Sequence, residues 1–160
     1  MTVSPSKNLG LELHTLVSRL ERAGDEILRA EHDLSYRRFM VLVMLHGLGE
    51  CTQRALADSM AVTEPSMSRM VAALADTGLL TVVPDPGGGN RRQIALTDTG
   101  RALVEYAGTD LIQRLTELVD SSGVPFDTYF AHTRRLNAAL EGGRTRPGTP
   151  TPSSRIRSTS

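Results

Sequence analysis

The residues best suited to chemistry lie on one face of a helix predicted to begin at Glu64. Thr63 can cap this helix through its hydroxyl group, and Pro65 falls in the first turn, where a missing amide hydrogen costs nothing. The apolar side chains at helical spacing are Met67, Met70, Val71 and Leu74. The opposite face and its flanks carry small or polar residues around one arginine: Pro65, Ser66, Ser68, Arg69, Ala72 and Asp76. Such a face suits close approach to base edges and phosphates, although an ordinary solvated face is the alternative.

The segments on either side of this helix predict a helix-turn-helix followed by a β-hairpin. Residues 53–60 form a short helix that carries Arg54, and Ala61-Val62 form a tight turn. Residues 79–83 and 93–96 have the composition of strands, with a Pro- and Gly-rich turn between them. The hairpin tip bears Asn90, Arg91 and Arg92, at the distance where a wing could reach a flanking groove. The predicted DNA-contacting set is Arg54, Thr63, Glu64, Pro65, Ser66, Ser68, Arg69, Asn90, Arg91 and Arg92.

These residues resemble the MarR-type winged-helix regulators over roughly Leu9 to Leu140. The resemblance rests on three segments: residues 56–71, residues 74–80 with Asp76, Gly78 and Leu79, and Leu96-Thr97-Asp98-Thr99-Gly100-Arg101. It implies a mainly α fold with a small two-stranded β-wing and with dimerisation helices at both ends. One departure lies in the wing, where an ungapped alignment places Gly88-Gly89-Asn90 at the family's Asp-x-Arg signature. We therefore expect Arg91 and Arg92 to be displaced toward the second strand, so that the wing's DNA contact is shifted or its internal salt bridge is missing.

Long amphipathic helices flank the predicted DNA-binding unit, and their apolar faces are too large for it to cover. The segment 39–45 is apolar on all sides and is predicted at the centre of the fold, while Ala102, Leu103, Tyr106 and Leu111 begin the stripe of a later helix. The predicted dimerisation residues are Leu9, Leu13, Leu16, Phe126, Tyr129, Phe130, Leu136 and Leu140. The resemblance likewise implies a two-fold homodimer, which would require a pseudo-palindromic operator.

The chain is predicted to divide into four regions by role. Residues 1–34 form the N-terminal dimerisation helix, 35–100 the winged helix-turn-helix, 101–141 the C-terminal dimerisation helices, and 142–160 a disordered basic tail. The tail holds four arginines and no acid, which leaves 14 Lys and Arg against 18 Asp and Glu, a net charge of −4, in residues 1–141. Non-specific affinity of the body for DNA should therefore be modest and should depend on local patches.

The resemblance implies a repressor that is relieved by a small, often phenolic or aromatic, ligand bound between the dimer helices and the winged helix. Candidate ligand-binding residues at this junction are His14, Tyr36, Phe39 and His46, although Tyr36 and Phe39 fit the hydrophobic core better. A winged-helix protein-interaction module and a ligand-independent DNA binder are the alternatives. Salt-dependent DNA binding would separate a DNA binder from an interaction module.

Several other classes of protein are not favoured by the sequence. The segment Gly87-Gly88-Gly89 lacks the strand and helix that a phosphate-binding loop needs, and no nucleophile elbow is present, so we expect no enzyme. The four histidines are scattered without metal-ligand spacing, and we expect neither a metal nor a cofactor. Cys51 is the single cysteine, which agrees with a reducing compartment. Because no apolar run approaches 18 residues and no signal segment is visible, we expect a cytoplasmic protein.

Overall fold

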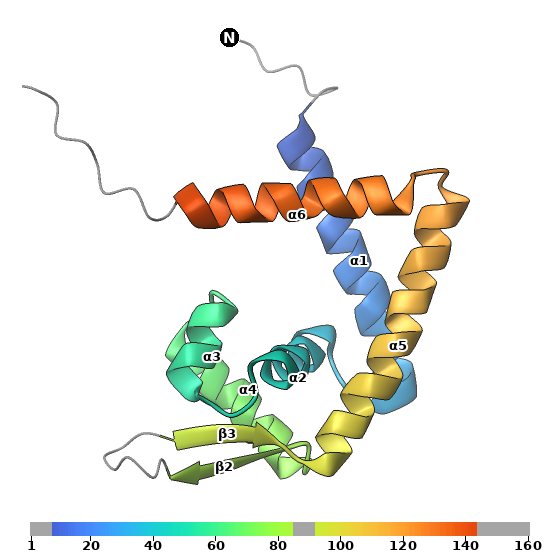
Figure 1. Ribbon diagram of the computed structural model, residues 1–160. Helices are drawn as coiled ribbons and strands as arrows, with labels where there is room; N and C mark the ends of the chain where they lie inside the picture. Colours follow the sequence, from blue (N-terminus) through green and yellow to red (C-terminus); the bar gives the residue numbers. More distant parts are fainter. Residues whose placement is uncertain (1–7, 85–91, 144–160) are drawn as a thin grey trace, which may run out of the picture. The chain divides into compact units, whose positions relative to one another are not determined.

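The computed structural model describes residues 8–84 and 92–143, which divide into two compact units (Figure 1). The first unit extends to Arg114 and the second begins at Leu115, within one long helix. In chain order the elements are α1 (Leu9–His32), α2 (Tyr36–Leu48), β1 (Cys51–Thr52), α3 (Gln53–Ser59), α4 (Glu64–Asp76), β2 (Leu80–Pro84), β3 (Arg92–Leu96), α5 (Asp98–Ser121) and α6 (Phe126–Gly143). The mainly helical fold with a small β-wing is therefore as predicted.

Local capping sets where the first four helices begin. The residue before each helix has extended backbone, and its side chain accepts a hydrogen bond from the amide three residues on; these caps are Asn8, Ser35, Thr52 and Thr63. Each such cap typically stabilises a helix by about 1 kcal/mol. The predicted capping role of Thr63 is confirmed.

Helix α2 lies at the centre of the first unit, as its uniformly apolar sequence predicts. It contacts α1, α3, α4 and β3, and these elements surround it in Figure 1. The largest fully buried side chains come from α1, α2, α3, α4 and β3: Leu28, Val41, Leu42, Leu45, Leu56, Met67, Leu74 and Ile94. Both helices of the helix-turn-helix are thus anchored to one shared core by their apolar faces.

The sheet has three strands, where the sequence analysis predicted two. All pairs are antiparallel in the order β1-β3-β2, with Cys51 opposite Ile94 and Val82 also opposite Ile94 on the other side. The extra strand, β1, is only two residues long, too short to show an alternating pattern in the sequence. It ties the start of α3 to the wing, because Thr52 both pairs with Gln93 and caps α3.

The junction of α1 and α2 is fixed by Asp25. One carboxylate oxygen accepts a hydrogen bond from the Tyr36 amide at 2.8 Å, and the other accepts from Arg29 Nε at 2.5 Å. The Arg29 side chain and then the Tyr36 amide lower the pKa of Asp25, although its partial burial opposes them. Because the lowered pKa favours the charged form in the folded state, this contact stabilises the fold above the carboxyl's ordinary pKa and is lost as the pH falls below it.

The apolar stripe of α5 is offset from the predicted one. Val104 and Ala107 are buried, whereas Ala102 and Tyr106, two of the residues predicted for the stripe, are exposed. Val104 and Ala107 belong to the hydrophobic core of the first unit, and Gly108 beside them faces α2, where a Cβ would make an ordinary contact of 3.9 Å with Phe39 Cζ. Tyr106 instead packs edge-to-face against His32 of α1, with ring centroids 6.0 Å apart.

The second unit contains the end of α5 and helix α6, and its apolar side chains are conspicuously uncovered. On α6 the phenyl rings of Phe126 and Phe130 stack with centroids 6.1 Å apart, yet Phe130, Leu136 and Leu140 remain 54%, 54% and 69% exposed. Within the described ranges, no helix combines the length and apolarity needed to cross a bilayer.

Candidate nucleic-acid interface

Helix α4 presents its two faces as the sequence predicts. Met67, Met70, Val71 and Leu74 are buried, and the helix ends before Gly78, whose φ of +72° suits glycine. The outward residues Glu64, Pro65, Ser68, Arg69, Ala72 and Asp76 are exposed, while Ser66 is half-buried and donates its amide to Thr63 Oγ1 at 3.4 Å. The polar face around Arg69 is therefore open to solvent and is built on a fixed apolar base.

The turn between α3 and α4 is tight and closed by backbone hydrogen bonds. Ala61 N–H donates to Asp58 O at 3.2 Å, and Val62 N–H donates to Ala57 O at 3.1 Å. Ala61 takes a left-handed φ of +52°, which is uncommon for a residue with a side chain. Leu56 and Ala57 of α3 are buried, and α3 packs on α4. These contacts give the helix-turn-helix arrangement that the sequence predicts.

Arg54 and Glu64 meet across this turn, a pairing that the sequence analysis did not predict. Arg54 Nε lies 3.9 Å from Glu64 Oε1, and the two side chains are 78% and 59% exposed. An exposed ion pair at this distance contributes little to stability. Its importance is geometric, because it places a guanidinium and a carboxylate together beside the first turn of α4.

The wing hairpin places Arg92 at the start of β3, opposite Pro84 of β2. The second strand thus begins one residue earlier than predicted, and Arg92 belongs to the strand and not to the hairpin tip. The side chain of Arg92 is exposed. Asn90 and Arg91, the other predicted wing contacts, lie outside the described residues.

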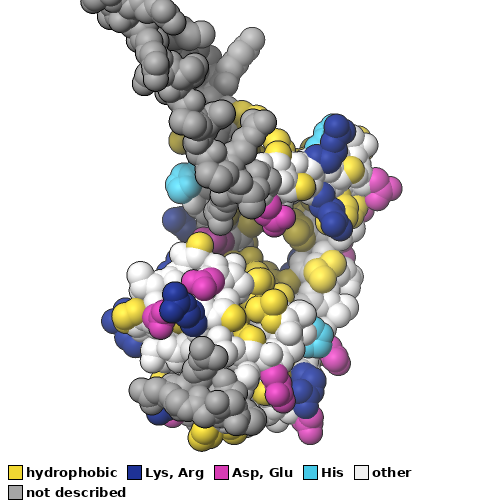
Figure 2. Space-filling model, turned by 60° about the vertical axis from the view of Figure 1, so that its left-hand side comes forward, with side chains coloured by type: hydrophobic (Ala, Val, Ile, Leu, Met, Phe, Trp, Pro, Cys, Tyr) yellow, Lys and Arg dark blue, Asp and Glu magenta, His cyan; other side chains and the backbone are white. Residues whose placement is uncertain are grey.

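Basic side chains do not dominate the surface around these elements. On the face drawn in Figure 2, the described Arg side chains are interspersed with Asp and Glu side chains. Between residues 54 and 92 of the described chain, the exposed arginines Arg54, Arg69 and Arg92 are matched in number by the exposed acids Asp58, Glu64 and Asp76. A phosphate backbone would thus meet local cationic points and not a continuous basic field.

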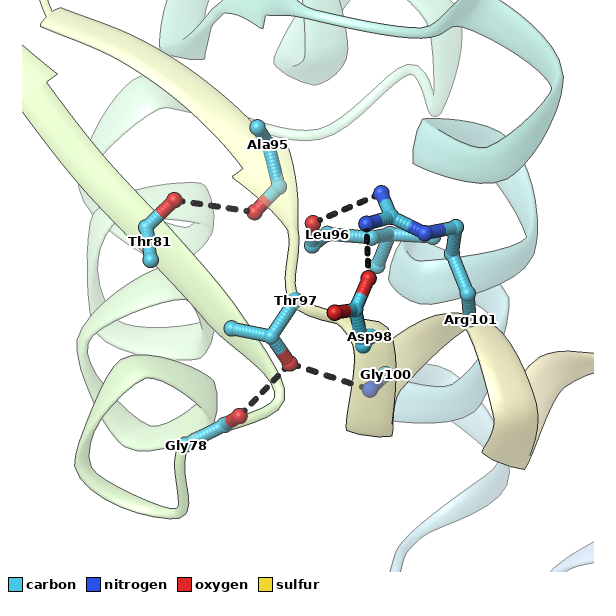
Figure 3. A network of polar contacts seen from close by, with 8 residues as sticks. All are labelled: Gly78, Thr81, Ala95, Leu96, Thr97, Asp98, Gly100 and Arg101. Carbon is cyan, nitrogen blue, oxygen red and sulfur yellow. Dashed lines mark hydrogen bonds and ion pairs between the residues drawn. The ribbon is translucent and has the colours of Figure 1, made fainter.

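A polar network joins the wing, the end of α4 and the start of α5 (Figure 3). Thr97 Oγ1 donates to Gly78 O at 2.7 Å and accepts from the Gly100 amide at 3.0 Å, so one hydroxyl links both helices. Arg101 donates to Leu96 O at 3.0 Å and pairs with Asp98 at 2.5 Å. The segment from Leu96 to Arg101 is one of the three segments that carry the family resemblance. It connects the wing to the end of α4 and to the start of α5.

The four candidate ligand-binding residues do not converge on one point in the first unit. Phe39 is 3% exposed and belongs to the core. Tyr36 is half-buried and lies against Gly24, where a Cβ would come within 2.6 Å of the ring. His14 and His46 are exposed. Because a helix rises 1.5 Å per residue, His14 lies about 15 Å along α1 from Gly24, and His46 about 15 Å along α2 from Tyr36.

Cys51 lies half-buried in β1, and its burial raises the pKa of the thiol above its ordinary value. Because the thiolate is the reactive form, we expect iodoacetamide to label the folded protein at pH 7.5 several-fold more slowly than the urea-unfolded protein. Mass spectrometry over a pH series gives the rates, and the rate for the folded protein should level off at a higher pH than the rate for the unfolded protein. Equal rates for folded and unfolded protein at pH 7.5 would contradict this assignment. In the described part of the chain, no three His, Cys, Asp or Glu side chains are grouped to hold a metal ion.

Comparison with known proteins agrees with this geometry. Residues 32–89 match the sequence model of the MarR family. An HTH-type transcriptional regulator of Mycobacterium tuberculosis, and one of Mycobacterium bovis that is uncharacterized, are each 34% identical over 74 residues, which is 46% of this chain. The match spans about half the length of these curated relatives, 52%.

Solved structures share the fold over most of the chain. A MarR-family transcriptional regulator from Rhodococcus sp. RHA1 superposes with a TM-score of 0.76 at 24% identity, covering 87% of this chain and 96% of that one. A mutant MarR from E. coli complexed with operator DNA gives 0.69 at 24% identity, covering 82% and 93%. The MepR–DNA complex of S. aureus gives 0.69 at 20% identity, covering 84% and 97%. The helix-turn-helix, the wing and the match of residues 32–89 agree, so this part of the chain resembles the MarR family in sequence, and the chain has the winged-helix fold of the solved MarR structures.

Proposed function

We propose that this protein is a transcriptional regulator that binds duplex DNA through α4 and the wing. The observation that carries the proposal is the exposed polar face of α4, with Arg69 at its centre and the apolar residues of the same helix buried. Small side chains around one arginine let a helix lie deep in a major groove, where a guanidinium can read guanine. The relatives named as transcriptional regulators and the family structures solved with DNA support this proposal.

The DNA contacts divide by role in this proposal. Glu64, Pro65, Ser66, Ser68 and Arg69 face base edges, while Thr63 and Arg54 lie at the edge of the groove. Arg92, together with Asn90 and Arg91, contacts the flanking backbone or minor groove from the wing. Since residues 1–141 carry a net charge of −4, affinity depends on these few contacts and falls steeply with salt.

The proposed working form is a homodimer built on the terminal helices. Apolar side chains are exposed in both units: Leu9, Leu13 and Leu16 on α1, and Phe126, Tyr129, Phe130, Leu136 and Leu140 on α6. Exposed apolar surface of this extent on consecutive helical turns is typical of an interface. A two-fold dimer would present two copies of α4 to half-sites about 10 bp apart.

Charge placed on the exposed stripe of α6 should break this dimer. The double substitution Phe130→Asp with Leu136→Asp removes apolar contacts and buries like charges, so we expect a monomer in sedimentation velocity and at least a 100-fold loss of operator affinity. Both side chains are 54% exposed in the single chain, so the fold itself should survive. Ala131→Asp, on the opposite face of α6, is the matched control and should remain dimeric. A stable dimer of the double variant would exclude α6 from the interface.

Binding of the dimer to a promoter would repress transcription by occlusion, and a small aromatic or phenolic ligand would relieve it. Such a ligand acts only if it binds the DNA-competent and DNA-incompetent arrangements unequally. Of the candidate contacts, Tyr36 is the one proposed to meet such a ligand, with Phe39 in the core behind it. His14 and His46 lie about 15 Å away along their helices, too far to contact the same small molecule within one subunit. Repeating the operator titration with a panel of phenolic acids tests this: unchanged affinity with every compound would remove the ligand from the proposal.

A protein-interaction module is the second candidate, and the interspersed acidic side chains favour it. Selection of the purified protein against a random duplex library, followed by titration at several salt concentrations, separates the two. Enrichment of a pseudo-palindrome, bound with a steep salt dependence, is the result expected of a regulator. No enrichment and a flat salt dependence would favour protein recognition instead.

A further inference from the structure

Glu64 places a negative charge on the face of α4 that is proposed to approach the phosphates of DNA. It is the first residue of α4 and is 59% exposed. Within the described part of the chain, the recorded partner of its carboxylate is Arg54, whose Nε lies 3.9 Å from Oε1. A carboxylate beside phosphates is repelled unless a group on the DNA donates a hydrogen bond to it, so an acid on this face could be stabilised by a donor in the groove.

Capping does not account for Glu64. The Thr63 hydroxyl already caps α4 through the Ser66 amide, and the acid of a capping box stands at the third helical position, which is Ser66. Glu64 therefore does not close a capping box. The structural role left for Glu64 is the weak electrostatic attraction between an acidic side chain and a helix N-terminus.

The chemistry of the major groove selects one base for such a side chain. A carboxylate only accepts hydrogen bonds, and among exposed base edges the N4 amino group of cytosine and the N6 amino group of adenine donate. The adenine amino group lies beside the N7 acceptor, which repels a carboxylate, so cytosine is the better partner. Arg69 lies about 7.5 Å farther along the helix axis, roughly two base steps, where it would read guanine.

We propose that Glu64 is a specificity-determining residue that reads one cytosine in each half-site, and that Arg54 is the positioning residue that holds its carboxylate. This inference rests on the proposed DNA-binding function. Arg54 Nε lies 3.9 Å from Glu64 Oε1, an ion-pair distance that is too long for a hydrogen bond, and the guanidinium carries five N–H donors. It can therefore bind a phosphate while it orients the carboxylate, which offsets the repulsion between that carboxylate and the backbone.

The test is the base preference of variants at the operator selected by the wild-type protein. Duplexes carrying each of the four base pairs at every half-site position are competed against one another. The wild-type protein should prefer C·G at one position by about tenfold. Glu64→Gln should shift that preference to A·T, because an amide pairs with adenine N6 and N7. Arg54→Ala should weaken binding to all duplexes and also reduce the cytosine preference.

Asp76→Asn is the matched control, since it neutralises an exposed acid about 18 Å farther along the same helix. It should leave the preference at every position unchanged. If Glu64→Gln keeps the wild-type preference and only lowers the melting temperature, Glu64 acts on the helix alone and the inference is wrong. If the wild-type protein selects no DNA sequence, the proposed function itself is wrong. This outcome is distinct from an unchanged base preference of Glu64→Gln, which contradicts only the role of Glu64.

Discussion

Gly100→Ala is expected to lower the free energy of unfolding by about 3 kcal/mol, the upper range for overpacking in a close-packed site. Gly100 lies in the first turn of α5, and a Cβ built there overlaps Leu79 O. That carbonyl is not a flexible neighbour, because it accepts a hydrogen bond from the Thr97 amide at 3.2 Å. To make room, the wing must separate from α5, which breaks the network that links Thr97 to Gly78.

The measurement is chemical denaturation of both proteins, with a thermal melt as a second readout. Gly108→Ala is the matched control, because it makes the same change on the same helix where the new Cβ would lie 3.9 Å from Phe39 Cζ, an ordinary contact. Since alanine favours helix over glycine by about 1 kcal/mol, the control should be neutral or stabilising. Equal effects of the two substitutions would show that the backbone near Gly100 yields easily.

Arg69→Ala is expected to weaken operator binding by about 100-fold or more in the dimer. Truncation of an arginine that reads a base typically costs about 1–3 kcal/mol, and the two-fold complex contains two copies. Arg92→Ala should weaken DNA binding less than Arg69→Ala does. It should weaken binding to all DNA sequences by the same factor, because a contact with the DNA backbone carries no base information. When the logarithm of affinity is plotted against the logarithm of salt concentration, removing Arg92 from both subunits should also reduce the slope by about two.

Fluorescence anisotropy gives the affinity for the selected operator, and titrations at several salt concentrations give its salt dependence. Arg22→Ala is the control, since Arg22 is an exposed arginine on α1 and its loss changes the net charge equally. It should leave affinity within a few-fold of the wild type. All three arginines are exposed, so melting temperatures should not change. If Arg69→Ala binds the operator as the control does, α4 does not read the DNA.

Much of the fold could be predicted because its signals are local. The cap at Thr63 and the helical spacing of Met67, Met70 and Val71 depend on residues within a few positions of one another. The strand β1 could not be predicted, since two residues carry no pattern and Cys51 takes its conformation from Ile94, far along the chain. The stripe of α5 was misassigned at Tyr106 for a similar reason. Its apolar ring is long enough to pack on α1 while smaller neighbours face α2.

The candidate site divides in the same way. The sequence alone determined that Arg69 and its small polar neighbours share one face of a helix, because the helical period fixes which side chains lie together. Only the tertiary structure decided that Arg54 meets Glu64 and that Thr97 joins Gly78 to Gly100. Contacts between elements depend on how helices pack around α2, and that packing is a property of the whole core and not of any one segment.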